Sequence, residues 1–250
     1  MAQAARAPRG RGRPRAGEEI DLALLLQGAL DAFAETGYDG TSVRELSRRL
    51  GVSHALLTAR FGSKEGLWFA AMEYALAEAE QTWREVSDSP GLDDLEALRH
   101  GVVRQVLFSA AHPQVLRIMS HEGAIDSPRV RFVIDRFVNP LRPGVERLLT
   151  RLVATGRIRH VPYVTLHFLV VVGGGAIFAN PVEAALLGAP AHPDAEDIRA
   201  HAEAVADVLI AGIAVTPPGP RPAATAGHVT RMSNEPGEDK ESPGARKLTH

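Results

Sequence analysis

The residues best suited to a chemical task in this sequence are polar side chains between Ser53 and Lys64. Arg60 can pair with O6 and N7 of guanine, and Thr58 can hydrogen-bond a base or touch the methyl group of thymine. On a helix over this segment, the exposed positions would be Ser53, His54, Ala55, Thr58, Ala59 and Arg60. The segment therefore predicts a surface that contacts base edges in DNA.

Two short helices separated by a tight turn would position these residues. The S-x-x-E pattern that begins at Ser42 matches a capping box, and the helix it opens ends at Gly51. Ser53 then caps a second helix that runs to about Phe61. This order is the spacing of a helix-turn-helix motif, whose second helix lies in the major groove. Thr41 and Ser42, where the first of these helices opens, are further candidate DNA contacts.

A further helix is predicted directly after Gly62. Ser63 is expected to cap it, and Lys64 with the first free backbone amides would form a clamp for a DNA phosphate. The alternative for the whole segment is a plain three-helix packing unit whose polar residues are only solvated.

The segment from about residue 20 to 70 resembles the DNA-binding domain of TetR/AcrR-type transcriptional regulators. The resemblance implies a homodimer that binds a palindrome and a small molecule in a helical bundle that alters the spacing of the two DNA-binding heads. The chain has Thr58, Ala59 and Arg60 where the family often has aromatic residues, so the family's operator contacts are not transferred to it. The matching residues are Ala29, Phe33, Gly37, Tyr38, Thr41, Ser42, Val43, Leu46, Gly51, Val52, Ser53, Leu57, Phe61, Ser63, Lys64, Glu65 and Leu67.

The formal net charge of −2 argues weakly against nucleic-acid binding, but the charge is unevenly distributed. Residues 1–17 contain five arginines and no acidic residue, next to the predicted DNA-binding helices. Within this arm, Arg11 and Arg13 flank a glycine and resemble the core of AT-hook peptides, which enter narrow A·T minor grooves. The alternative is a solvated tail that only raises non-specific affinity.

The composition and the motifs that are missing favour an all-α protein that is not an enzyme. Alanine and leucine are abundant, alternation of β-branched residues is rare, and the chain has no cysteine for disulfides or thiolate zinc sites. Catalytic signatures such as G-x-S-x-G and H-E-x-x-H are missing, and no two histidines are spaced i, i+4. We expect no cofactor, no metal and no membrane partner, and the absence of a secretion signal predicts a cytoplasmic location.

The chain is predicted to divide into a disordered basic arm (1–17), a helix-turn-helix domain (18–64), a helical ligand-binding and dimerisation domain (65–215) and a disordered tail (216–250). The first helix should start near Glu18 or Glu19 and stop at Gly37. In the helical domain we expect helices over 92–111, 113–124 and from 128, with Pro140 and Pro143 as a kink or break before the helix resumes to about 156, and then over 162–178 and 194–213.

Candidate ligand-binding residues occur in two of these helices. His121 and Glu122, with Arg117 one turn earlier, would be polar anchors in a pocket, or alternatively a surface ion pair. His167, Phe168 and Phe178 are candidates for lining the same pocket, although core packing is the alternative for both phenylalanines. The stretch 163–179 is too short for a membrane span, and its glycines 173–175 would allow close approach of a neighbouring helix.

Two functions follow from these patterns. The first is a repressor that binds a palindromic operator in double-stranded DNA as a homodimer and is released by a small-molecule effector. The helices from 162 and from 194 would pair with their copies as a four-helix interface. The alternative is an all-α enzyme or small-molecule carrier with an incidental helix-turn-helix.

Overall fold

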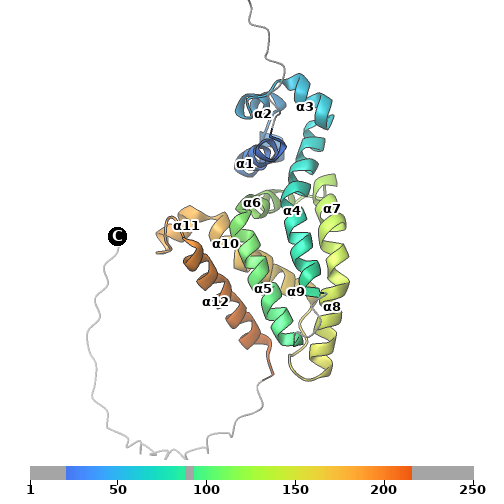
Figure 1. Ribbon diagram of the computed structural model, residues 1–250, viewed down its shortest axis with the longest axis vertical. Coiled ribbons are helices and arrows are strands. Elements are labelled where there is room, and N and C mark those ends of the chain that lie inside the picture. Colours follow the sequence, from blue (N-terminus) through green and yellow to red (C-terminus); the bar gives the residue numbers. More distant parts are fainter. Residues whose placement is uncertain (1–20, 88–92, 216–250) are drawn as a thin grey trace, which may run out of the picture. The chain divides into compact units, whose positions relative to one another are not determined.

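Short polar caps and glycine turns divide the described chain into helices. The computed structural model describes residues 21–87 and 93–215, and apart from one isolated bridge between Ile158 and Ala214 their regular structure is helical (Figure 1). The all-α prediction is therefore confirmed. The elements are α1 (Leu22–Gly40), α2 (Val43–Arg49), α3 (His54–Phe61), α4 (Lys64–Ser87), α5 (Asp94–Ala111), α6 (Pro113–Glu122), α7 (Pro128–Val133), the π-helix η1 (Ile134–Val138), α8 (Asn139–Ala154), α9 (Tyr163–Phe168), the π-helix η2 (Leu169–Gly173), α10 (Gly174–Ala179), α11 (Pro181–Leu186) and α12 (Ala195–Ile213).

The first helix begins later than predicted. Asp21 is its N-cap, because the carboxylate accepts hydrogen bonds from the amides of Ala23 and Leu24. The predicted start near Glu18 or Glu19 is therefore wrong. The predicted stop at Gly37 corresponds to a break in the backbone, since this residue has φ of 72° and interrupts the helical conformation three residues before the end of α1.

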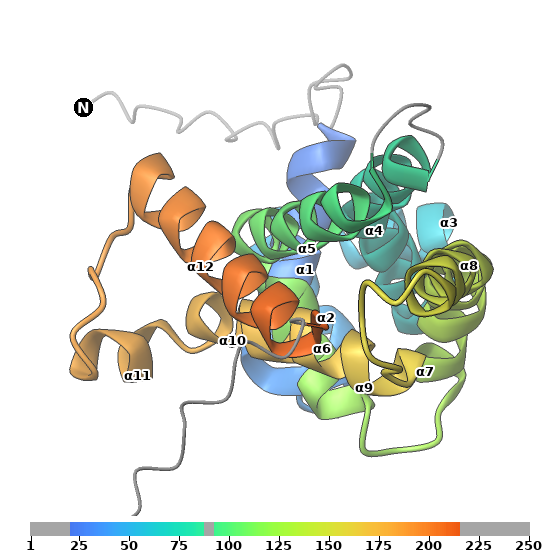
Figure 2. The ribbon, with the colours of Figure 1, turned by 90° about the horizontal axis from the view of Figure 1, so that it is seen from below.

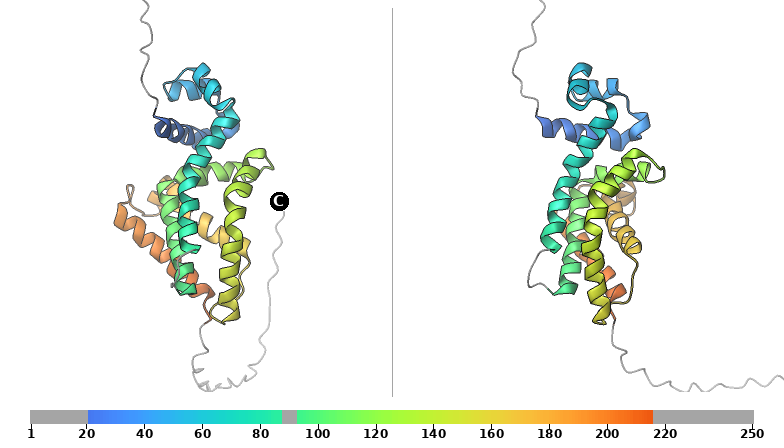
Figure 3. Two further views of the ribbon diagram at one scale, coloured as in Figure 1. Left: turned by 45° about the vertical axis from the view of Figure 1, so that its right-hand side comes forward. Right: turned by 90° about the vertical axis from the view of Figure 1, so that its right-hand side faces the viewer.

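The first four helices enclose a core with α6, α7 and η1. Trp68 on α4 and Leu30 and Phe33 on α1 are completely or almost completely buried in it, and Ile118 of α6 and Phe137 of η1 belong to the same cluster. Figure 3 shows α4 running from the group of α1, α2 and α3 into the helical bundle. The apolar core therefore continues from α1–α3 through α4 into the bundle. The division into two domains at residues 64 and 65 stays a prediction.

A second core lies within the bundle, where α12 packs along α5 (Figure 2). Leu152, Val106, Ala202 and Ala206 are completely buried there. The glycines of α10 permit close packing, because a Cβ atom on Gly174 would lie 2.7 Å from Cγ2 of Val106. The expectation that glycines 173–175 allow close approach of a neighbouring helix is therefore confirmed for this position, and the neighbour is α5 of the same chain.

Two π-helical segments were not predicted. The chain stays helical from Pro128 to Ala154, so the prolines at 140 and 143 do not end the helix. The amide of Asn139 donates to the carbonyl of Ile134, five residues earlier, so the hydrogen-bond register widens directly before Pro140. A second π segment, η2, interrupts the predicted helix over 162–178, and α11 follows in a region for which no helix was predicted.

Candidate nucleic-acid interface and ligand cavity

Helix α3 presents the predicted outward face. Its N-cap is Ser53, whose hydroxyl accepts from the amide of Leu56, and Leu57 is the side chain that fixes the helix in the core. The glycine turns on either side, at Gly51 and Gly62, have φ of 67° and 74°, which only glycine adopts without strain. The six positions predicted to be exposed are all exposed: Ser53, His54, Ala55, Thr58, Ala59 and Arg60.

The positive charge available on this part of the chain is small. Arg48 pairs with Glu45, and Arg49 pairs with Glu35. These hydrogen bonds from arginine lower the pKa of both carboxyl groups. Among the described residues Arg60 has no carboxylate partner, so its fork of donors is free to contact a base.

Helix α2 begins as predicted, but only half of its capping box forms. The hydroxyl of Ser42 accepts from the amide of Glu45, whereas the carboxylate of Glu45 is bound by Arg48. Thr41 does not have the expected exposure, because its side chain is buried and its hydroxyl donates to the carbonyl of Gly37. The prediction that the Thr41 side chain contacts DNA is therefore corrected: it fixes the break at the end of α1.

Lys64 is half-buried, and its ammonium group is bound by the protein. Its ammonium group donates to the carbonyls of Tyr38 and Thr41, over distances of 2.9 and 3.0 Å, and lies 3.9 Å from the centre of the Tyr38 ring. Ser63 caps α4 as predicted, since its hydroxyl accepts from the amide of Gly66. The end of α1 is thereby tied to the start of α4. The arm residues Arg11 and Arg13, the remaining DNA-binding candidates, lie outside the described residues.

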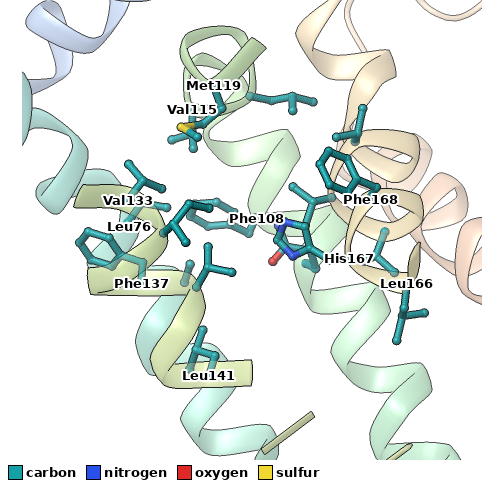
Figure 4. A pocket seen from close by; sticks show the side chains of 18 of the residues that line it. Leu76, Phe108, Val115, Met119, Val133, Phe137, Leu141, Leu166, His167 and Phe168 are labelled. Carbon is teal, nitrogen blue, oxygen red and sulfur yellow. The ribbon is translucent and has the colours of Figure 1, made fainter. Parts of the chain in front are cut away.

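A cavity of about 460 Å³ lies within the bundle. Helices α4 to α8 together with α9 and η2 form its wall, and Figure 4 shows Leu76, Val133 and Phe137 on one side of it and Leu166 and His167 on the other. Its volume is in the range of pockets that hold small organic molecules. Its polar lining residues are Glu80, Gln105, Ser120, Tyr163 and His167.

Burial changes the titration of two of these groups. It lowers the pKa of the His167 imidazole and raises the pKa of the Tyr163 hydroxyl, because a less polar surrounding disfavours the charged form of each. The ring of His167 lies between two aromatic neighbours, 5.9 Å from Tyr163 and 5.6 Å from Phe168 between centroids. The imidazole is therefore mostly neutral at physiological pH and can donate one hydrogen bond and accept one.

The DNA-binding part of the chain has recognisable relatives. Residues 25–71 match the family model of the bacterial regulatory proteins of the TetR family. This part of the chain is therefore similar to the helix-turn-helix segment of TetR-type regulators. The family that this segment matches consists of regulatory proteins and not of enzymes.

Two curated relatives show the same relationship. An uncharacterized HTH-type transcriptional regulator of Bacillus subtilis, YezE, is 34% identical over 74 residues, which are 30% of this chain and 38% of the relative. The HTH-type transcriptional repressor Rv3405c of Mycobacterium tuberculosis is 39% identical over 64 residues, 26% of this chain and 34% of that protein. The matches thus span about a third of the length of these relatives.

Solved structures show that the fold extends over most of the chain. HlyIIR, a hemolysin II transcriptional regulator, aligns over 77% of this chain and 96% of its own, with a TM-score of 0.56 and 17% identity. FadR from Bacillus subtilis, in complex with stearoyl-CoA, covers 76% of this chain and 98% of its own, with a TM-score of 0.54 and 17% identity. At these identities the likeness shows the fold alone.

Only two of the six predicted ligand-binding residues line the cavity. His167 and Phe168 line the cavity, whereas Phe178 packs in the second core with its ring 5.4 Å from that of His201. Arg117, His121 and Glu122 are not part of the wall. They were predicted as polar anchors, but the α6 side chains that reach the cavity are Val115, Leu116, Met119 and Ser120.

Two of these three residues make contacts outside the cavity. His121 packs against the backbone at Gly37, and the buried carboxylate of Glu122 accepts from Ser127 and Arg129. Arg129 was not singled out in the sequence. Its position two residues after the helix cap Ser127 resembles that of any charged residue in a first turn, so no local pattern identified it.

The described part of the chain offers few other kinds of site. None of its helices combines the length and the apolar content that a membrane span requires. No group of three or more metal-binding side chains occurs among residues 21–87 and 93–215.

Proposed function

We propose that this regulator represses transcription by binding a palindromic operator as a homodimer, and that a small molecule in the bundle cavity releases it. The observation that carries the proposal is the outward face of α3, where Thr58 and Arg60 are exposed in the last turn of the helix that Ser53 caps. Residues of this kind read bases from the major groove. The proposed phosphate contacts are Ser42, at the start of α2, and the first backbone amides of α4. Lys64 orients the start of α4 through its hydrogen bond to the carbonyl of Tyr38.

Exposed apolar side chains on the last helices support the dimer. Val164 and Leu169 are more than half exposed, and Val208 on α12 is 76% exposed. A Cβ atom on Gly173 or Gly212 would meet no other atom within 4 Å, so a second copy could approach the backbone there. Two copies that pair through these helices would present two heads to the two halves of a palindrome.

A pair of charge substitutions tests the dimer. Val208→Asp should convert the dimer into a monomer in light scattering, because a carboxylate would be buried without a partner. Val182→Asp is the matched control, since Val182 on α11 is 73% exposed and lies outside the two helices assigned to the interface. Monomeric wild-type protein at micromolar concentration, or equal effects of the two variants, would contradict the assignment.

The proposed release follows from what the cavity wall touches. Val130 and Gly123 line the cavity, and their chain neighbours Arg129 and Glu122 are bonded to each other and contact α1 and α4. A ligand that prefers one arrangement of these helices would shift the population of head positions. FadR, in its complex with stearoyl-CoA, is a protein of this fold with an organic ligand, which supports a small-molecule effector.

Fluorescence anisotropy with labelled DNA tests the DNA-binding function. Fragments from upstream of the protein's own gene and its neighbours should bind at least about a thousandfold more tightly than random DNA of equal length at physiological salt. Equal affinity for both would reject a specific regulator and leave the carrier alternative.

A further inference from the structure

The cavity wall lacks fixed positive charge. None of the described residues that line it is a lysine or an arginine. A carboxylate or phosphate enclosed by this wall would lose its hydration without gaining a cationic partner, and burial of an unpaired charge is strongly unfavourable.

Two arginines that contact residues of the wall are already engaged with carboxylates. Arg136 lies 3.3 Å from a carboxylate oxygen of Glu80 and 3.8 Å from one of Glu73. Arg142 donates to Glu146 over 2.8 Å, with its guanidinium carbon 5.1 Å from the centre of the Tyr163 ring. An anionic ligand would therefore have to displace a carboxylate from either arginine. A cationic ligand would in turn compete with Arg136 for Glu80, the one charged side chain of the wall.

The polar groups that remain suit an uncharged partner. His167 projects from α9 among apolar side chains, and its ring nitrogens have no hydrogen-bond partner among the residues that the structure describes. A neutral imidazole can bond to a hydroxyl or a carbonyl group.

We propose that the cavity selects an uncharged, mostly apolar effector with one hydroxyl or carbonyl group bonded to His167, and that it discriminates against carboxylates and against cations. The inference rests on the proposed function, because it takes this cavity to be the effector site. It adds the chemical class of the effector, which neither the family model nor the fold specifies.

Isothermal titration of the full chain with three ligands of one length tests the class. Decanol, decanoate and decylamine differ only in a head group that is neutral, anionic or cationic at about pH 7.5. Decanol should bind at least about tenfold more tightly than either ion. Equal or tighter binding of decanoate or decylamine would overturn the inference, and so would the absence of binding by all three.

Substitutions of His167 test the assigned contact. His167→Leu should weaken decanol about fivefold, as expected for one lost hydrogen bond, while His167→Gln should stay within about twofold of wild type. Both variants should leave the weak binding of decanoate unchanged. Wild-type affinity of His167→Leu for decanol would overturn the role of this residue, and the Gln variant shows that an effect does not come from misfolding.

The outcomes separate this inference from the proposed function. A preference for decanoate together with specific operator binding would overturn the neutral class and keep the regulator. Failure of all operator fragments to bind would reject the regulator, whereas the ranking of the three head groups would still decide the chemistry of the cavity.

Discussion

The guanidinium carbon of Arg129 lies 3.6 Å from the centre of the Tyr38 ring, so a residue at the start of α7 contacts the end of α1. The same side chain donates from Nε to Glu122 of α6 over 3.0 Å and lies 3.5 Å from Glu65 of α4. Four helices therefore meet at one arginine, whose side chain is only 13% exposed. Such a contact stabilises the position of the end of α1 and the start of α4 relative to the cavity wall.

Removing this arginine should be costly. Arg129→Ala would leave the Glu122 carboxylate, 6% exposed, without its cation, and should lower the free energy of unfolding by about 3 kcal/mol. Arg131→Ala is the matched control two residues along, because Arg131 pairs with Asp126 in solvent and its loss should leave the free energy of unfolding nearly unchanged. Urea unfolding of both variants at neutral pH measures the difference. Equal losses would show that the buried contact has no special weight.

Arg60 should determine sequence preference and not general affinity. Arg60→Ala should relax the preference at one base pair per half-site by about 1–3 kcal/mol, the value of a bidentate contact with guanine. Arg60→Lys is the control for charge, since lysine keeps the cation but lacks the planar fork. Binding to a set of operators with single base changes measures both variants. Equal losses on specific and random DNA would assign Arg60 to the phosphate backbone.

The stability of the regulator should fall in mild acid partly through His167. Burial lowers the pKa of this imidazole in the folded chain, so below about pH 6.5 the unfolded chain binds more protons than the folded one. The stability that this residue contributes is thus present above that pH and is lost as the pH falls. The difference in unfolding free energy between about pH 7.5 and about pH 5.5 should be smaller in His167→Gln than in wild type. The same difference in unfolding free energy in both proteins would contradict a contribution of His167 to the acid sensitivity.

Local chemistry made the DNA-binding helices predictable. Ser42, Ser53, Ser63 and Asp194 each cap the helix that follows them, because a cap depends on residues two or three positions apart. The exposed face of α3 follows from the helical period in the same way. Sequence reasoning failed at Thr41, directly before the α2 cap Ser42. The burial of Thr41 depends on the backbone break at Gly37, whose carbonyl accepts from its hydroxyl.

The cavity could be predicted only in part, because its wall combines residues from distant helices. His167 and Phe168 were found because they stand in an apolar stretch, although the Phe168 side chain is 59% exposed. Arg117, His121 and Glu122 form an equally suggestive polar group in the sequence, yet none of them lines the cavity: His121 lies against Gly37 of α1, and Glu122 binds Arg129. Which face of α6 lines the cavity is decided by its packing against α1 and α10, and no pattern within α6 contains that information.

The charge pattern of the DNA-binding part leads to a prediction about the arm at residues 1–17. Between Glu18 and Gly62 the sequence has seven acidic residues against four arginines. Two of those arginines are paired in the structure, which leaves Arg44 and Arg60 without a carboxylate among the described residues. The head alone therefore attracts DNA weakly, and the five arginines of the arm should supply much of the electrostatic attraction.

Deleting residues 1–16 measures that contribution. Each neutralised phosphate adds about 0.9 to the slope of log affinity against log salt, so if three or more arginines engage, the deletion should flatten the slope by roughly 3 per protomer. If Arg11 and Arg13 enter the minor groove, the loss should be larger where A·T pairs flank the half-sites, since their groove is narrow and more negative. Salt series on A·T-flanked and G·C-flanked operators separate the two roles. An unchanged slope would make the arm a passive tail, and a flattened slope without dependence on the flanks would keep the phosphate contacts and remove the minor-groove reading.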